Sequence, residues 1–259
     1  MAFVKLPVFK RGMVLTHEML EQLKNYSQDM GNISYTDYSD GVVSGCQVLV
    51  EGMRITLKRG IVCFEGNVIP VPEGLSALVS PCNVWHALCL QISEPYNEKN
   101  FRGVDIELVV VTDVSQIGNK IELCRFRMQE GAHMRNVYRD FNDLNTEFDT
   151  LNVIYAKWAG YKSSTVSSVV LEEFAKEAIR KGVQNPLDIN FIQQILNLDG
   201  RSMNRQTIEF YIAIRVGRPY KEMTGLEIFM GLAEILRNLV PTGERMPMRQ
   251  RDERRIIVD

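Results

Sequence analysis

The sequence predicts an α+β protein with an N-terminal helix, an antiparallel β sandwich or barrel module, and an α-helical C-terminal domain. Apolar residues have helical spacing before residue 31, alternate in steps of two between Asp40 and Glu130, and return to helical spacing after residue 163. The chain has 259 residues, of which 45% are hydrophobic and 24% are charged, so it is long and apolar enough to bury a core. We divide it into an N-terminal arm and helix (1–38), a β-module (39–130), a connector (131–162), a helical domain (163–240) and a mixed-charge tail (241–259).

The first predicted helix begins at Thr16, whose hydroxyl suits the N-cap position. Leu15 and Leu20 have the spacing of a hydrophobic staple across that cap. Gly31 is expected to end the helix. The residues expected on its apolar face are Met19, Leu20, Leu23, Ser27 and Met30.

The β-module is predicted from residues that alternate in steps of two. Met53, Ile55 and Leu57 alternate with polar residues, so we expect all three to point inward. Glycines divide the region into short strands, and no helical pattern separates them, which favours antiparallel pairing. Further strands are expected at 85–92, 106–112 and 120–128.

The connector carries eight large apolar residues that step by three and four positions, which is typical of a long helix with a coiled-coil-like seam. The Asn, Asp and Thr residues between them favour caps and turns instead. The alternative is an extended connector whose aromatic side chains fill neighbouring grooves. In either case the eight side chains should cover the β-module, pack on the C-terminal helices, or form an interface with another copy or partner. They are Met134, Val137, Phe141, Leu144, Phe148, Leu151, Tyr155 and Trp158.

Four short helices are predicted in the C-terminal domain, at about 168–181, 186–198, 203–216 and from Thr224 to a point before Pro241. Asn185 and Pro186 have the order of an N-cap and a first helical residue. Thr224 and Glu227 have the spacing of a capping box. The short links between the helices favour a small bundle.

No catalytic, phosphate-binding or metal-binding motif is recognisable in the chain. The three histidines (His17, His86, His133) lie in different segments. Cys82, His86 and Cys89 have the one metal-like spacing, but on a strand His86 and Cys89 point to opposite faces. We therefore expect a protein that is not an enzyme and binds no metal or cofactor. A cell-wall hydrolase with an unrecognised site is an alternative.

A helix-turn-helix DNA-binding regulator is the other alternative, built from the helices around residues 186–216. Its phosphate contacts would be Arg201, Arg205, Arg215 and Arg218. However, residues 163–240 carry nine basic and nine acidic side chains, and the whole chain has a net charge of −2. Nucleic-acid binding usually requires a basic excess, so we expect none. We also expect no membrane insertion, because no apolar run is long enough to span a bilayer.

Three segments, in this order along the chain, resemble proteins of contractile tails. Residues 6–20 (LPVFKRGMVLTHEML) resemble the start of baseplate proteins of phages and phage-tail-like particles and, distantly, of type VI secretion baseplate proteins that attach to the wedge. Residues 43–48 (VSGCQV) and 55–69 (ITLKRGIVCFEGNVI) resemble a strand–Gly-Ile–strand–Gly pattern near the N-termini of tail-fibre and baseplate proteins. Residues 121–135 (IELCRFRMQEGAHMR) are similar to a segment of proteins in clostridial prophage and R-type bacteriocin (diffocin-like) tail clusters.

This resemblance implies a structural wedge or fibre-attachment protein. It assigns no catalytic residues to this sequence. Its implied partners are other baseplate and tail-fibre proteins and further copies of itself within the particle. It would be made in the bacterial cytoplasm and incorporated into a virion or tail-like particle that is released by lysis. The absence of a signal-peptide pattern at the N-terminus agrees with this expectation.

Overall fold

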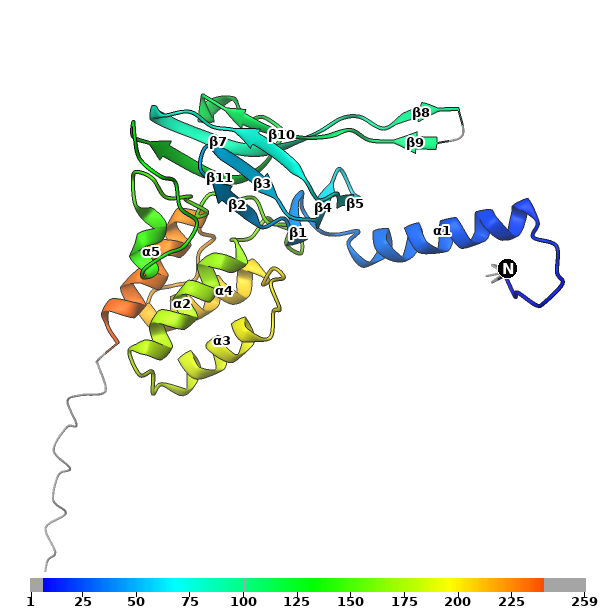
Figure 1. The fold of residues 1–259 in the computed structure, drawn as a ribbon. Helices are drawn as coiled ribbons and strands as arrows, with labels where there is room; N and C mark the ends of the chain where they lie inside the picture. Colours follow the sequence, from blue (N-terminus) through cyan, green and yellow to red (C-terminus); the bar gives the residue numbers. More distant parts are fainter. Residues whose placement is uncertain (1–6, 100, 240–259) are drawn as a thin grey trace, which may run out of the picture.

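The computed structural model describes residues 7–99 and 101–239, and it confirms the predicted order of one helix, a β-module and a helical region (Figure 1). The predicted tail at 241–259 lies outside the described residues. The helices are α1 (His17–Ser34), α2 (Ser168–Arg180), α3 (Pro186–Leu196), α4 (Arg205–Val216) and α5 (Gly225–Arg237), with two short 3-10 helices, η1 (Val114–Gln116) and η2 (Phe141–Asn145). The strands are β1 (Gly41–Gly45), β2 (Val48–Glu51), β3 (Arg54–Leu57), β4 (Gly60–Phe64), β5 (Asn67–Val71), β6 (Leu75–Leu78), β7 (Cys82–Ile92), β8 (Tyr96–Glu98), β9 (Phe101–Gly103), β10 (Ile106–Val111) and β11 (Ile121–Met128).

The β-module consists of three small antiparallel sheets and a separate hairpin. The sheet orders are β1-β4-β5, β2-β3-β6 and β10-β7-β11, and β8 pairs with β9 in the hairpin. Every pairing between these strands is antiparallel, as predicted. One continuous hydrophobic core extends from the β-module into the helical region, so the two parts share their buried side chains.

The predicted register of β3 is correct at two of its three positions. Ile55 and Leu57 are buried, as expected for one face of a strand with a period of two. The expectation that Met53 points inward is wrong, because Met53 is 50% exposed. It belongs to the two-residue turn between β2 and β3, where Glu51 pairs with Arg54, so the alternation of the strand does not extend to it.

The connector is extended, so the predicted long helix is wrong and the alternative of an extended connector is correct. Its only regular element among the described residues is η2, which Asp140 caps by accepting a hydrogen bond from the Asp143 N–H. The Asn152 side-chain oxygen likewise accepts a hydrogen bond from the Ile154 N–H, and the Thr146 hydroxyl donates to the Asp143 carboxylate. The side chains of Asp140 and Asn152 thus satisfy backbone groups that a helix would have to pair internally.

The connector obtains its backbone partners from two strands of the β-module. Asn152 exchanges two backbone hydrogen bonds with Arg125 of β11, at 2.7 and 2.8 Å, and the Lys157 N–H donates to the Glu122 carbonyl at 2.7 Å. Farther along, Val42 of β1 bonds to the residues on both sides of Trp158. At this point a Cβ on Gly41 would lie 2.6 Å from connector backbone, so the close approach requires glycine.

The eight apolar residues of the connector mostly face the core of this chain. Met134, Phe141, Leu144, Leu151 and Trp158 are buried, Phe148 and Tyr155 are half-buried, and Val137 is 74% exposed. Phe141 stacks on Phe229 of α5 at a centroid distance of 4.8 Å and meets Phe174 of α2 edge-on. The two half-buried rings lie under β11 arginines, with Tyr155 under Arg125 and Phe148 under Arg127. The segment therefore joins the sheet to the helices, whereas its role in an interface with a partner stays a prediction.

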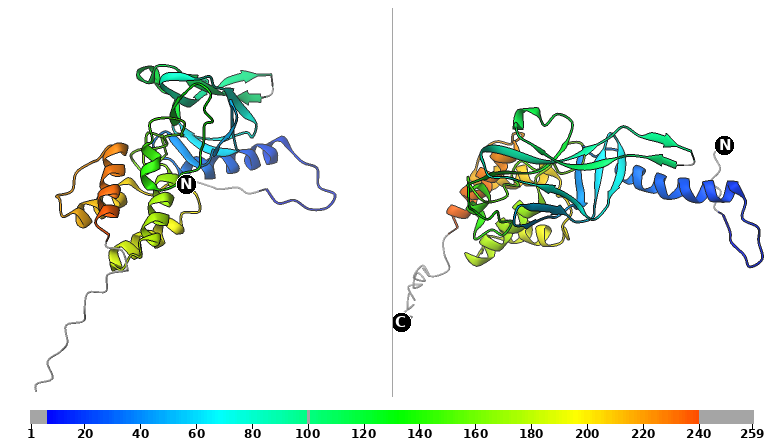
Figure 2. Two further views of the ribbon diagram at one scale, coloured as in Figure 1. Left: turned by 60° about the vertical axis from the view of Figure 1, so that its left-hand side comes forward. Right: turned by 45° about the horizontal axis from the view of Figure 1, so that its top comes forward.

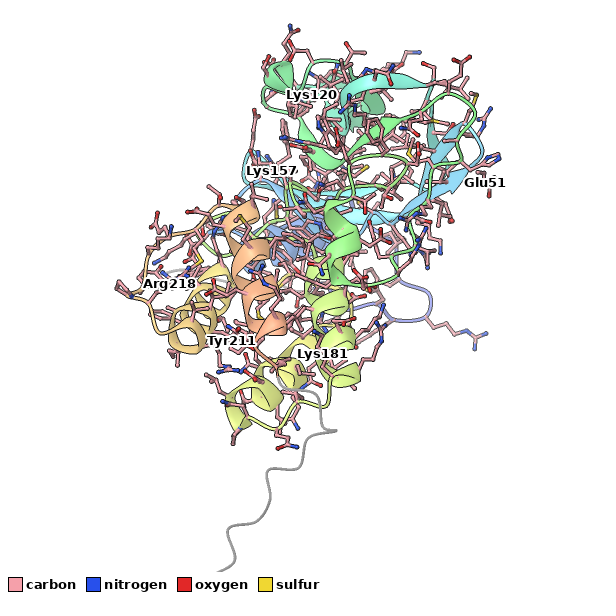
Figure 3. The ribbon with its side chains drawn as sticks, turned by 90° about the vertical axis from the view of Figure 1, so that its left-hand side faces the viewer. Glu51, Lys120, Lys157, Lys181, Tyr211 and Arg218 are labelled. Carbon is pink, nitrogen blue, oxygen red and sulfur yellow. The ribbon has the colours of Figure 1, made fainter. Side chains whose placement is uncertain are left out.

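The helical region begins its helices where the sequence indicates. Asn185 caps α3, and Thr224 and Glu227 form the predicted capping box at α5. The third helix begins two residues later than predicted, at Arg205, because Asn204 is its cap. The Met203 carbonyl is then free to accept a 2.8 Å hydrogen bond from the Thr165 hydroxyl, which links the start of α4 to the segment that follows the connector. In Figure 3 Lys157 lies near the level at which the β-module meets the helices.

We predict that Ile55→Asp unfolds the β-module, whereas Thr56→Asp is mild. The first change buries an unpaired carboxylate and should cost about 4 kcal/mol or more in the free energy of unfolding, and the second should cost about 0.5–1 kcal/mol. Urea denaturation followed by tryptophan fluorescence measures both. Equal effects of the two substitutions would contradict the register of β3.

A second prediction concerns the ion pair between Arg135 and Asp143, which holds the start of the connector. Two guanidinium nitrogens of Arg135 donate to the Asp143 carboxylate at 2.5 and 2.6 Å. These hydrogen bonds hold the pKa of Asp143 well below its usual range. Because the pKa is lower in the folded chain, the pair stabilises the fold at neutral pH and loses this contribution as the pH falls below about 4.

Asp143→Asn should therefore lower the free energy of unfolding by about 2 kcal/mol at pH 7 and by much less at pH 3. Glu73→Gln is the matched control, because Glu73 is exposed in the turn between β5 and β6. Urea titrations of the three proteins at both pH values measure the difference. A loss of stability that is the same at pH 3 and pH 7 would exclude this ion pair as its cause.

Candidate interaction surface

Helix α1 and the β8–β9 hairpin project from the β-module in the same direction, and we call them the two arms (Figures 1 and 2). Helix α1 begins as predicted, with the Thr16 hydroxyl accepting a hydrogen bond from the Met19 N–H at 3.3 Å. The expected stop at Gly31 is wrong, because the helix continues to Ser34. The hydroxyls of Ser34 and Thr36 donate to the carbonyls of Met30 and Asn32, which lets the helix end later.

The C-terminal end of α1 is fixed to the body of the protein. The rings of Tyr35 and Tyr38 pack edge-on at 4.9 Å, and Tyr38 packs on Tyr161 of the connector at 6.4 Å. In the last turn of the helix, the Asn32 side-chain oxygen accepts a hydrogen bond from the Val68 N–H of β5 at 3.3 Å. The direction of the arm is therefore set at its base.

One face of α1 carries an exposed apolar stripe, which we call the α1 seam. Its residues are spaced by four, three, four and three positions, a period of 3.5. Apart from Met19, which is half-buried, their side chains are between 46% and 70% exposed. Full burial of such a side chain contributes roughly 1.5–3 kcal/mol to stability, and the exposed seam does not gain this free energy. The seam consists of Met19, Leu23, Tyr26, Met30 and Ile33.

The α1 seam is not a membrane span. None of the helices in the described ranges is both long and apolar enough to cross a bilayer. The acidic and basic residues Glu18, Glu21 and Lys24 lie around the other faces of α1, which makes the helix amphipathic.

The hairpin is the second arm and also carries exposed aromatic residues. Tyr96 of β8 pairs with Gly103 of β9, and a Cβ on Gly103 would lie 2.8 Å from the Tyr96 ring. The Tyr96 hydroxyl donates to Asp105 at 3.0 Å, and this hydrogen bond raises the pKa of Tyr96. Phe101 is 78% exposed.

A groove of about 500 Å³ lies between the bases of the two arms, and we call it the arm groove. Its floor is β5, the end strand of its sheet. Two features block the outer edge of β5, because Asn32 occupies the Val68 N–H and Pro70 has no N–H. The groove is lined by Gln28, Gly31, Asn32, Phe64, Glu65, Asn67, Val68, Ile69, Pro70, Ile92, Ser93, Pro95, Gly103 and Val104.

The cysteine and histidine residues with metal-like spacing lie on one strand of the β-module. Cys82, His86 and Cys89 lie on β7, where the His86 ring packs edge-on against Phe126. Cys89 is buried, and burial raises the pKa of its thiol to about 12, which disfavours the thiolate that binds metals. Within 7–99 and 101–239, no three His, Cys, Asp or Glu residues are arranged to hold a metal ion.

The four arginines of the helix-turn-helix alternative are bound to acidic residues of their own domain. Arg205 bonds to the buried Glu209 and to backbone carbonyls of Ser164 and Met223. Arg215 donates to the buried Asp188 at 2.5 Å, and Tyr211 donates to the same oxygen at 2.9 Å. The other two arginines, Arg218 and Arg201, pair with Glu234 and Asp199. These contacts favour a structural role for the arginines, and Figure 3 shows Arg218 at the outer edge of the helical region.

Sequence reasoning placed a candidate interface in the connector, and that location stays a prediction. The expected face of α1 included Leu20 and Ser27 and omitted Tyr26 and Ile33. In the structure Leu20 is exposed as expected, and Tyr26 and Ile33 are also exposed, in line with Met19, Leu23 and Met30. The 3.5-residue spacing from Met19 to Ile33 was the signal that could have located the seam. No pattern in the sequence indicated the hairpin.

No protein-family model and no curated protein matches the chain. Among solved structures, it is similar to a crystal structure of TssK, with 9% identity and a TM-score of 0.39 over 90% of this chain and 72% of that chain. It is also similar to a chain of the type VI secretion system TssK-TssF-TssG baseplate subcomplex (TM-score 0.37) and to one of the baseplate complex from the type VI secretion system (TM-score 0.38). Both share 9% identity with it, over 92% of this chain and 99% of theirs. At these values the likeness establishes neither a family nor a function.

Proposed function

We propose that this protein is a non-enzymatic structural component of the baseplate of a contractile tail or contractile injection particle. The observation that carries the proposal is the α1 seam, an apolar surface on a projecting helix that the other described residues leave largely exposed. A surface of this kind marks a site of protein–protein contact. The resemblance of three ordered segments to baseplate and tail-fibre proteins supports the choice of assembly.

The particle we propose is a phage or a phage-tail-like particle of the R-type bacteriocin kind, in which the chain is a wedge or fibre-attachment protein. Its partners are other baseplate and tail-fibre proteins, which it contacts through the two arms. Such a protein acts as a structural part of the particle and catalyses no reaction. The buried thiols and the internally paired arginines support this reading over a hydrolase or a DNA-binding regulator.

Deletion of the gene should give particles without a complete baseplate or without fibres, because an assembly protein acts by its presence. Negative-stain electron microscopy of particles from the deletion strain, with and without a plasmid copy of the gene, measures this outcome. Restoration by the plasmid is the control for effects on neighbouring genes. Fully infective or bactericidal particles from the deletion strain would refute the assignment.

We also predict that the purified protein contains no stoichiometric metal ion, in line with a structural role. Elemental analysis after dialysis against buffer without chelator measures the metal content. One zinc ion per chain would overturn the prediction, and the group of Cys82, His86 and Cys89 would then be tested first by Cys89→Ser.

A further inference from the structure

We propose that a cavity where β1, the connector and α2 meet binds a neutral saccharide unit. The cavity has a volume of about 330 Å³, at the lower end of the roughly 300–1,000 Å³ that small-molecule sites occupy, and we call it the junction cavity. Its walls come from β1, β2, β11, the connector, the N-terminal part of α2 and the loop between α3 and α4. The site goes beyond the proposed assembly function, and neither proposal depends on the other.

Two buried side chains that line the junction cavity lack a hydrogen-bond partner. Trp158 is 7% exposed and Ser168 is 4% exposed, and neither the indole N–H nor the Ser168 hydroxyl bonds to any described residue. Of the described side-chain nitrogens and oxygens, those that are both inaccessible to solvent and unbonded belong to Arg127 and Asp188. The indole N–H and the hydroxyl therefore keep access to solvent, and a ligand in the cavity can bond to them.

Glu172 provides a hydrogen-bond acceptor in the same cavity. It is half-buried in the second turn of α2, and within the described ranges it has neither an ion pair nor a hydrogen bond. The other two glutamates in the middle of the helix differ, because Glu173 pairs with Lys176 and Glu177 pairs with Arg180. A half-buried carboxylate without a partner has lost part of its hydration and gained no hydrogen bond in return, which favours a ligand that donates to it.

The charges of the junction cavity exclude anionic ligands. Two acidic residues line it, Glu172 and Asp199, and none of the described lining residues is Lys, Arg or His. The N-terminus of α2 opens here, but Ser167 already caps it, since the Val169 N–H donates to the Ser167 hydroxyl oxygen and the Val170 N–H to the Ser167 carbonyl. A phosphate or carboxylate would therefore meet repulsion from two carboxylates without a basic side chain to offset it.

The indole N–H favours a neutral ligand over a cation. An ammonium group only donates hydrogen bonds, whereas Trp158 requires an acceptor. A hydroxyl group does both, so hydroxyls can accept from Trp158 and donate to Glu172. Apolar side chains, among them Leu151 and Val169, also line the cavity and suit the C–H face of a sugar ring. Several hydroxyls on a ring with an apolar face are the chemistry of a neutral monosaccharide, either free or at the end of a glycan.

The fluorescence of Trp158 reports directly on occupation of the cavity. Trp85→Phe removes the other tryptophan of the chain, which is half-buried on β7 and does not line the cavity. In this background, at least one of a panel of neutral hexoses, deoxyhexoses and N-acetylhexosamines should change the fluorescence saturably, with a Kd in the low millimolar range or below. The methyl glycoside of that sugar binds equally well if the cavity takes the end of a glycan, and more weakly if it takes the free sugar. A panel without any saturable response would overturn the proposal.

Glu172→Gln tests the acceptor of the site. The substitution keeps the shape of the side chain and breaks no hydrogen bond to a described residue, so the variant should fold normally, which thermal unfolding checks. It should weaken binding of the same sugar at least tenfold, because hydrogen bonds to a charged acceptor are stronger than those to an amide. Glu177→Gln is the matched control, since it removes a carboxylate of the same helix that does not line the cavity, and it should change the affinity less than twofold. Unchanged affinity in Glu172→Gln would refute the site.

Charged probes test the class of ligand. The uronic acid of the best sugar adds a carboxylate to the same ring and should bind at least tenfold more weakly. Propylammonium, a cation without an acceptor, should give no saturable response in the same range. Tighter binding of either probe than of the neutral sugar would overturn the assignment of the ligand. None of these measurements involves a particle, so normal particles from the deletion strain would refute the assembly function alone.

Discussion

The fold depends on the backbone pairing of the connector with β11 and β1. Residues 131–162 form almost no regular structure of their own, so their buried N–H and C=O groups need partners elsewhere. Arg125 and Val42 provide such partners in two different sheets, which brings the two sheets together. Phe141 then projects from the same segment into the helices, against Phe174 and Phe229. A single irregular segment thus positions the helical region on the β-module and makes one core of both.

The body of the molecule pairs charged groups at buried positions, whereas α1 exposes a line of large apolar residues. In the body, even charged residues at buried positions find partners, as Glu209 does with Arg205 and Tyr220. On α1, large apolar side chains remain in water although a core of the same chain lies at its base. Folding alone does not explain this arrangement, because a short exposed helix gains most of its stability from what it packs against. The exposed apolar line on α1 is therefore the feature on which the proposed assembly function rests.

The sequence predicted correctly those features that depend on neighbouring residues. Its predictions were wrong where contacts between residues far apart in the chain determine the conformation. The caps at Asn185 and Thr224 and the burial of Ile55 follow from neighbouring residues alone, and the structure confirms them. The spacing from Met134 to Trp158 suits a helix as well as an extended chain that fills several grooves, and those grooves are formed by residues far away in sequence. Gly31 is a weak stop, because hydroxyls beyond it take up the last carbonyls of α1. The sequence predicted an apolar face on α1 but not its exposure, because exposure is a property of the whole fold.

The hydrogen bond between Asn32 and Val68 also affects the outer edge of β5 in the isolated protein. The Asn32 side-chain oxygen accepts a hydrogen bond from the Val68 N–H at the outer edge of β5. A strand of another molecule could pair with this N–H only after the base of α1 had moved away from it. Pairing of another strand with the Val68 N–H and the contact between Asn32 and β5 therefore exclude each other. Loss of the Asn32 contact would leave the Val68 N–H without its partner, whereas Pro70 would still block its own part of the edge. The base of α1 and Pro70 together thus cover the outer edge of β5 against pairing with another strand.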